Sequence, residues 1–102
     1  MYCLGLARIE LHLPACHSLK EKRALLNHLK EHLRRRNLSV SETGHQDEWQ
    51  RTAIALALVG HGEDAVRRFL AEAVEIAASQ DGAMLIAEAI DVHPLGNGES
   101  EQ

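Results

Sequence analysis

The chain has 102 residues, a hydrophobic share of 45% and a formal net charge of −4 at pH 7. A chain of this size can bury one core, and this apolar share excludes wholesale disorder. Aromatic residues make up only 3% of the chain, which argues against a surface that stacks a series of nucleic-acid bases.

The first expected element is a strand over residues 2–13. Apolar residues alternate with Arg8, Glu10 and His12, which is the period of a strand, and a proline follows. The two charged residues interrupt the N-terminal apolar stretch, so no signal peptide is expected. Cys3 and Cys16 flank the strand, roughly 33 Å apart, too far for a disulfide. Reduced thiols favour a cytoplasmic protein.

The second element is an amphipathic basic helix that begins at Ser18. Ser18 and Glu21 form the pattern of a capping box, and Leu19, Leu26, Leu29 and Leu33 form one apolar stripe. Residues 18–36 carry a formal charge of +5, although the whole chain is acidic. The basic residues of this helix are Lys20, Lys22, Arg23, Lys30, Arg34, Arg35 and Arg36.

Two strands and a polar connection follow. Residues 38–43 alternate and predict a short edge strand, and residues 44–50 hold the single tryptophan, Trp49. Residues 52–59 are apolar on both faces, as in a central strand covered on both sides. Gly60-His61-Gly62 is expected to break that run.

The last third predicts one helix and one strand. From Glu63, apolar residues recur at helical spacing, and Asp81-Gly82 indicates a turn. Residues 84–92 form the final strand, with Ile86, Ile90 and Val92 facing inward. The expected apolar helix positions are Val66, Phe69, Leu70, Ala73, Val74 and Ala77.

The order β-α-β-β-α-β predicts a ferredoxin-like α+β fold. Two split βαβ units produce a four-stranded antiparallel sheet with both helices on one face, and the first and third strands are central. Residues 1–93 form this single domain, and residues 94–102 are expected to form a flexible acidic tail.

Two motifs resemble a known family. The segment L-H-L-P-x-x-H-S-L-K-E-K-R covers residues 11–23, and V-S-E-T-G-H-Q-D-E-W-Q-R covers residues 40–51. Together they resemble the YlxP-like bacterial family, a domain of unknown function. The resemblance implies a ferredoxin-like fold and a cytoplasmic location. Members are often encoded near genes for translation initiation and ribosome maturation, which suggests a ribosome-linked role. It implies no catalytic residue.

The two motif loops are the candidates for chemistry. A histidine oriented by a carboxylate can serve as a general base. The favoured interpretation is instead structural: Gln46 and Asp47 satisfy backbone amides, and Trp49 packs across the sheet edge. His17 orders the loop before the helix cap. The motif-loop candidates are His17, Ser18, His45, Gln46, Asp47, Trp49 and Arg51.

No enzyme activity, metal or cofactor is expected. Seven histidines invite a metal site, but the chain has no C-x-x-C or H-E-x-x-H pattern. His28 and His32 lie at i, i+4 on the first helix, and two ligands without a third are usually exposed histidines.

Two hypotheses of function remain. The first is a non-enzymatic accessory factor of translation or ribosome assembly that contacts ribosomal RNA or ribosomal particles through the seven basic residues of the first helix. The second is a homodimerising, protein-binding module with an acidic partner and no RNA binding. The open sheet face would form the dimer. Its expected outward residues are Leu4, Leu6, Ala53, Ala55, Ala57, Leu85, Ala87 and Ala89.

Overall fold

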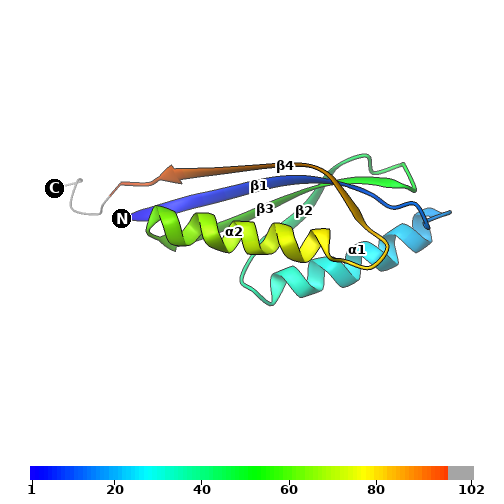
Figure 1. The fold of residues 1–102 in the computed structure, drawn as a ribbon, viewed down its shortest axis with the longest axis horizontal. Coiled ribbons are helices and arrows are strands. Elements are labelled where there is room, and N and C mark those ends of the chain that lie inside the picture. The colour runs from blue at the N-terminus through cyan, green and yellow to red at the C-terminus, as the bar shows by residue number, and fades with distance from the viewer. Residues whose placement is uncertain (97–102) are drawn as a thin grey trace.

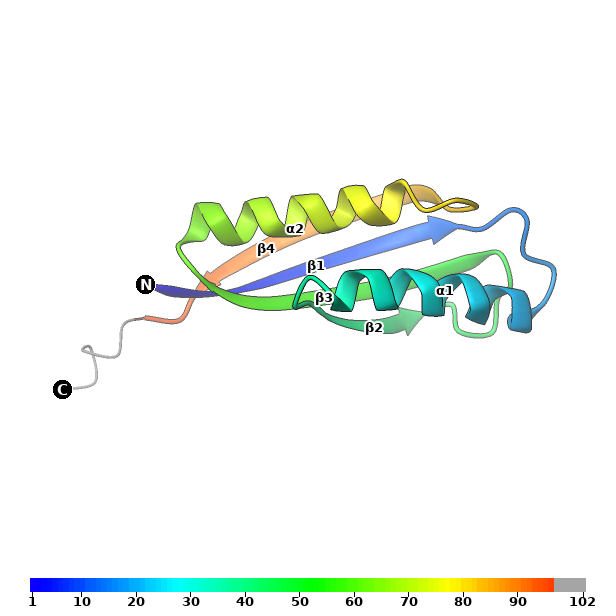
Figure 2. The ribbon, with the colours of Figure 1, turned by 90° about the horizontal axis from the view of Figure 1, so that it is seen from below.

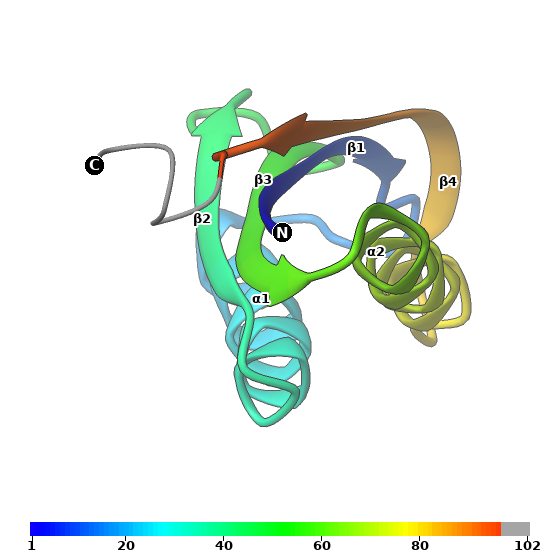
Figure 3. The ribbon, with the colours of Figure 1, turned by 90° about the vertical axis from the view of Figure 1, so that its left-hand side faces the viewer.

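The computed structural model describes residues 1–96 and contains one sheet and two helices. The antiparallel sheet has the strand order β2-β3-β1-β4, and both helices cover one face of it (Figures 1 and 3). This confirms the predicted ferredoxin-like fold with the first and third strands central. The elements are β1 (Tyr2–His12), α1 (Leu19–Arg34), β2 (Ser39–Gly44), β3 (Arg51–His61), α2 (Glu63–Ala78) and β4 (Met84–Pro94).

The two central strands form the floor of the core. Strand β1 pairs with β3 along its whole length, with Ala7 opposite Leu56 and Ile9 opposite Ile54. These four side chains are at most 1% exposed, because they point toward the helices. The alternate residues of both strands face the uncovered side of the sheet.

Strand β3 continues past the position where the sequence predicts a break. It runs through Gly60 to His61, and only Gly62, at φ 90°, ends it. A Cβ at residue 60 would lie 2.8 Å from a methyl group of Val66. Gly60 therefore permits close packing of α2 on the strand, and it does not form a turn.

Strand β4 departs from simple alternation. Its pairing with β1 shifts between Glu10 and Leu11, so Ile86 is an extra residue in a β-bulge. Ile86 is consequently 51% exposed, and the expectation that it faces inward is wrong. Leu85 pairs with the buried Leu11, which places Leu85 on the helix side, so its expected outward orientation is also wrong.

The C-terminal end of β4 reaches Pro94. The amide of Leu95 also donates to the carbonyl of Tyr2, at 2.8 Å. Most of the expected acidic tail, residues 97–102, lies outside the described residues.

Helix α1 begins where the sequence predicts. The Oγ of Ser18 accepts a hydrogen bond from the amide of Glu21, at 3.1 Å. The carboxylate of Glu21 in turn accepts from the amide of His17, at 2.6 Å. This reciprocal arrangement is a capping box shifted by one residue. The backbone of His17, and not its ring, therefore orders this loop.

Helix α2 packs closely on β1. A Cβ at Gly5 would lie 2.5 Å from Val66 and 2.7 Å from Leu70, so the glycine makes room for both side chains. Phe69 was expected on the apolar face, yet it is 54% exposed. The two helices lie apart over the sheet (Figure 2). Phe69 lines a hollow between α2 and the turn after α1, so it is not covered by the other helix.

The cap of α1 gives a first prediction. Replacing Ser18 by Ala removes the acceptor for the amide of Glu21, and we expect unfolding to require about 0.5–2 kcal/mol less free energy. Urea denaturation measures this difference. Ser39→Ala, an exposed serine in β2, is the matched control and should leave the midpoint unchanged. Equal midpoints for the two variants would contradict the role of the cap.

Candidate nucleic-acid interface

One of the seven basic residues of the first helix belongs to the core. Lys22 is 2% exposed and shares the buried face of α1 with Leu26, Leu29 and Leu33. It lies four residues before Leu26 and seven before Leu29, which is the spacing of the apolar stripe. The expectation that Lys22 contacts RNA is therefore wrong.

The Lys22 ammonium joins three parts of the chain. It lies 2.9 Å from a carboxylate oxygen of Glu42 in β2, and it donates to the carbonyls of His45, at 2.6 Å, and Glu48, at 2.8 Å. The same Glu42 oxygen accepts from the Thr52 hydroxyl, at 2.8 Å. The two sequence motifs therefore meet at this buried ammonium, which fixes the turn between β2 and β3.

The expected role of Gln46 and Asp47 in this turn needs correction. Two carbonyls of this turn, those of His45 and Glu48, accept hydrogen bonds from the ammonium of Lys22. Gln46 donates to the carbonyl of Glu42, at 3.4 Å, instead of accepting from an amide. Trp49 is 51% exposed, so it does not pack across the sheet edge as expected.

Charged side chains of the turn contact the end of β1. The ring of His45 lies between two carboxylates: its Nδ1 contacts Glu48, and its Nε2 is 3.5 Å from Glu10. Arg51 pairs with Glu10 at 2.8 Å and holds the pKa of that carboxyl below its usual value. These contacts bring together His45, Glu48 and Arg51 of the second motif with Glu10 of β1. The charged groups of this turn therefore have partners within the chain.

The second motif contributes hydrogen bonds to the loop before α1. The side-chain amide of Gln50 donates to the carbonyls of Pro14, at 3.2 Å, and Cys16, at 3.1 Å. Burial raises the pKa of the Cys16 thiol, so this sulfur is a poor nucleophile at neutral pH. Both Cys3 and Cys16 are free and buried, as expected.

The other six basic residues lie on the outward side of α1 or in the turn that follows it. Lys20, Arg23 and Arg34 are exposed, and Lys30 is partly exposed. Arg35 pairs with Glu31 at 3.2 Å, and Arg36 pairs with Glu72 of α2 at 2.9 Å. Exposed ion pairs contribute little free energy, so both arginines can exchange a carboxylate for a phosphate. We call Lys20, Arg23, Lys30, Arg34, Arg35 and Arg36 the α1 basic surface.

Among the residues that the structure describes, the histidines and the acidic residues do not gather into a metal site. Within residues 1–96, no group of three or more His, Cys, Asp or Glu side chains could hold a metal ion. His28 and His32 line a shallow hollow beside the end of α2. In the same part of the chain, neither helix has the length and apolar character needed to cross a membrane.

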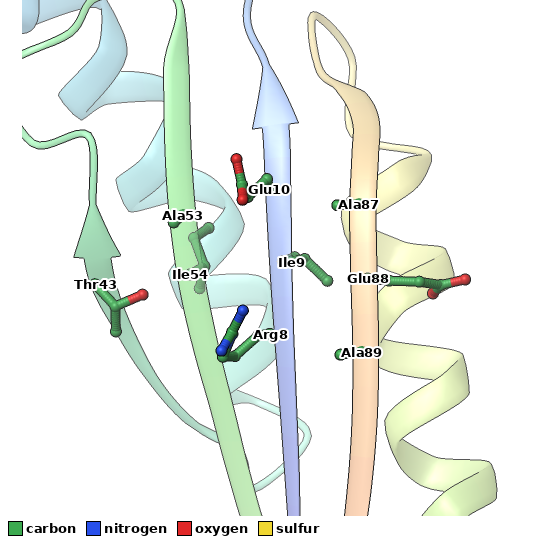
Figure 4. Close-up of a pocket in the computed structure, with 9 residues that line it drawn as sticks. All are labelled: Arg8, Ile9, Glu10, Thr43, Ala53, Ile54, Ala87, Glu88 and Ala89. Carbon is green, nitrogen blue, oxygen red and sulfur yellow. The ribbon is translucent and has the colours of Figure 1, made fainter.

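The opposite face of the sheet is uncovered and has a hollow of about 380 Å³. Figure 4 shows Arg8 and Glu10 of β1 over its floor, with Ala53 of β3 on one side and Ala87 and Ala89 of β4 on the other. Toward the other end of β1, apolar outward side chains lie beside polar ones, because Asp91 and His93 of β4 are opposite Leu6 and Leu4. Leu6 is 38% exposed and, in β3, Val59 is 62% exposed. The face therefore carries exposed apolar side chains among charged and polar ones along its whole length.

The chain is a small ferredoxin-like α+β protein with a basic surface on and after α1. Its two sequence motifs meet at the buried ammonium of Lys22 and stabilise the fold. The model of the family described as "Protein of unknown function (DUF503)" matches residues 4–90. The chain belongs to this family.

Proteins that are similar to the chain include a bacterial protein and a designed one. The "Uncharacterized protein YlxP" of Bacillus subtilis (strain 168) is 42% identical over 57 residues, which cover 55% of this chain and 62% of that protein. This agrees with the YlxP-like resemblance of the two motifs. A solved structure, the "De novo designed protein Foldit4", has a TM-score of 0.55 at 9% identity and covers 94% of this chain and 100% of that one. It supports the fold alone.

Four residues in the contacts around Lys22 and His45 were absent from the candidate residues of the sequence analysis: Glu10, Glu42, Glu48 and Thr52. The alternation of β2 offered a signal for one of them. Val40 faces inward, so Glu42, two residues on, faces inward too, and an inward carboxylate needs a cation. The matching signal for that cation is the helical spacing of Lys22, which lies four residues before Leu26 and seven before Leu29.

The network gives a second prediction. Lys22→Met keeps the apolar stem but leaves the carboxylate of Glu42 and two carbonyls without their cation. Removing one partner of a buried ion pair costs about 3–5 kcal/mol, so we expect a large loss of stability in urea denaturation. Lys20→Met, on the exposed side of the same helix, is the matched control and should have no such effect.

A double variant tests the cause of that loss. Lys22→Met combined with Glu42→Gln removes the unpaired charge and should recover part of the stability. The free energy of unfolding of the single variant Glu42→Gln completes the comparison. If the losses of the two single variants add up to the loss of the double variant, the two residues act independently.

Proposed function

We propose that the protein is a non-enzymatic, cytoplasmic accessory factor of translation or ribosome assembly that contacts RNA through the α1 basic surface. The observation that carries this proposal is the concentration of six exposed or partly exposed cations on α1 and the turn after it, in a chain whose net charge is −4. An acidic protein that keeps one strongly basic surface has a local field that attracts polyanions. The two buried free thiols support a reducing compartment.

The chemistry of this surface suits the phosphate backbone more than base edges. Arginine and lysine side chains on a helix neutralise phosphates and release counterions, which gives binding that weakens with salt and discriminates little between sequences. The family resemblance supplies the link to ribosomal RNA and ribosomal particles. An acidic protein is the alternative partner of the same surface.

Charge reversal on α1 gives a third prediction. Lys30→Glu with Arg34→Glu should weaken binding to ribosomal RNA. It should also reduce the slope of log affinity against log salt by about 1.4, because each contact with a single strand contributes about 0.7. Neither residue lies on the buried stripe of α1, so the fold should persist. Fluorescence anisotropy over a salt series measures both quantities.

The matched control makes the same change of charge on the other helix. Arg67→Glu with Arg68→Glu alters two exposed arginines of α2 and should affect binding less. Equal losses for both double variants would indicate that net charge alone governs affinity. If the wild-type protein does not bind ribosomal RNA or ribosomal subunits near physiological salt, the proposal is wrong and the surface is better assigned to an acidic protein.

A second candidate function, homodimerisation, is favoured by the uncovered sheet face. The outward residues of β3 include Ala53, Ala55 and Ala57, whose small side chains would let a second sheet approach closely. The exposed apolar side chains of Leu6 and Val59 would lose contact with water in a two-fold contact between identical faces.

Dimerisation gives a fourth prediction. Ala57→Glu introduces a carboxylate opposite Leu6 and Ser39, where no cation lies across the strand to pair with it. We expect the wild-type protein to be dimeric at micromolar concentration and this variant to be monomeric and folded, as measured by light scattering. Ala71→Glu, an exposed position on α2, is the control and should remain dimeric. A monomeric wild type would exclude the sheet-face dimer.

A further inference from the structure

A second hollow lies next to the C-terminal end of the α1 basic surface. It has a volume of about 220 Å³ and opens between the turn after α1 and the first half of α2. Its floor is the edge of β3. The residues that line this hollow include Arg36, Asn37, Leu58, His61, Val66 and Phe69.

The hollow exists because β2 is shorter than β3. Pairing between these strands begins with Ser39 opposite Ala57, so residues 58–61 of β3 have a sheet partner only in β1. Asn37, at φ 64°, turns the chain away from the end of α1 and into β2. The backbone edge of β3 at residues 58–61 is therefore left beside this turn without a strand to cover it.

Phe69 forms one wall and is 54% exposed. The chain has only three aromatic residues of the Phe, Trp and Tyr types, and this one lies neither in the core nor on the sheet. Asn37 and the uncovered backbone edge of β3 at residues 58–61 supply hydrogen-bonding groups at the same hollow. His61 also lines the hollow, and its ring packs edge-on against Tyr2. An aromatic ring beside hydrogen-bonding groups is the arrangement that binds unpaired bases.

The rim of the hollow is positively charged. Arg36 lines it and reaches Glu72 of α2, one helical turn after Phe69, at 2.9 Å. Its side chain is 43% exposed, and Arg34 and Arg35 precede it on the same basic surface. A strand whose phosphates contact these arginines would therefore pass the mouth of the hollow.

We propose that this hollow binds one unpaired nucleobase of an RNA strand, stacked on Phe69, while Arg34, Arg35 and Arg36 contact the flanking phosphates. This inference rests on the proposed function and specifies it: the RNA is recognised where it is single-stranded. The hollow is smaller than the roughly 300–1,000 Å³ of sites for drug-sized ligands, which suits one flat ring better than a peptide helix. The arginines at the rim of the hollow complement the phosphates of a nucleic acid. A site for an apolar peptide would not need these positive charges, so the charges favour RNA as the occupant.

The test compares Phe69→Ala and Phe69→Leu with the wild type. The probes are a fluorescein-labelled oligouridylate and a duplex RNA of the same length. Both variants should lose about tenfold in affinity for the single strand, within the range found when a stacked base loses its aromatic partner, and should bind the duplex as the wild type does. Leu keeps the hollow apolar but cannot stack, so it separates stacking from simple apolar contact.

A control and a spectroscopic measurement complete the test. Ile86→Ala removes another exposed apolar side chain, on β4, and should leave both affinities unchanged. Phe69→Trp in a Trp49→Phe background places the only tryptophan in the hollow, and its fluorescence should be quenched when the oligouridylate binds. Glu72→Gln should tighten binding of the single strand two- to threefold, because it releases Arg36 for phosphate.

The outcomes distinguish the inference from the proposal on which it rests. If the wild type binds RNA with the expected salt dependence but Phe69→Leu retains full affinity, the nucleobase site is wrong and the basic surface remains. A wild type that binds the duplex as tightly as the single strand overturns the site in the same way. If the wild type binds neither RNA, the proposed function fails, and a protein segment becomes the occupant to test.

Discussion

The buried ammonium of Lys22 is the interaction on which the arrangement of this protein depends. A charge that is withdrawn from water needs several partners, and here a carboxylate of β2 and two carbonyls of the following turn surround it. The network sets the rotation of α1 over the sheet, because Lys22 lies on the same helix face as Leu26, Leu29 and Leu33. The remaining cations of the helix are directed outward as a result.

This geometry places two different surfaces on opposite sides of the molecule. The helices cover one face of the sheet, so the α1 basic surface lies on the helix side and the alanine-rich face lies on the other (Figure 3). A polyanion on the helices and a second copy on the sheet would not compete for space. The two proposed contacts are therefore physically independent, and each can be tested without disturbing the other.

The network also explains why the two sequence motifs occur together. The first motif supplies the helix cap and the buried lysine, and the second supplies the turn whose carbonyls the lysine binds. Gln50 adds hydrogen bonds from the second motif back to the loop before the helix. A histidine flanked by carboxylates at this place has a structural explanation in the same turn, since its ring contacts Glu10 and Glu48.

The sequence by itself determined the order of the elements, the start of α1 and the central position of β1 and β3. These features depend on local signals: a serine cap with Glu21 three residues later, strict alternation in β1, and an apolar run in β3. The absence of a disulfide between Cys3 and Cys16 also followed from a local signal, because the extended strand between the two residues holds them apart. Each follows from backbone geometry over a few residues, so no distant contact was required.

Only the tertiary structure decided which side chains along those elements are buried. Lys22 looked like one solvent-facing cation among seven, until the opposite carboxylate of Glu42 gave it a partner in the core. The bulge opposite Glu10 and Leu11 reversed the orientation of residues at the start of β4, and the separation of the helices left Phe69 exposed. In each case the burial of a side chain depends on a partner far away in the chain. The reason is that this partner sets the free energy of burying a charge or of forming an apolar contact.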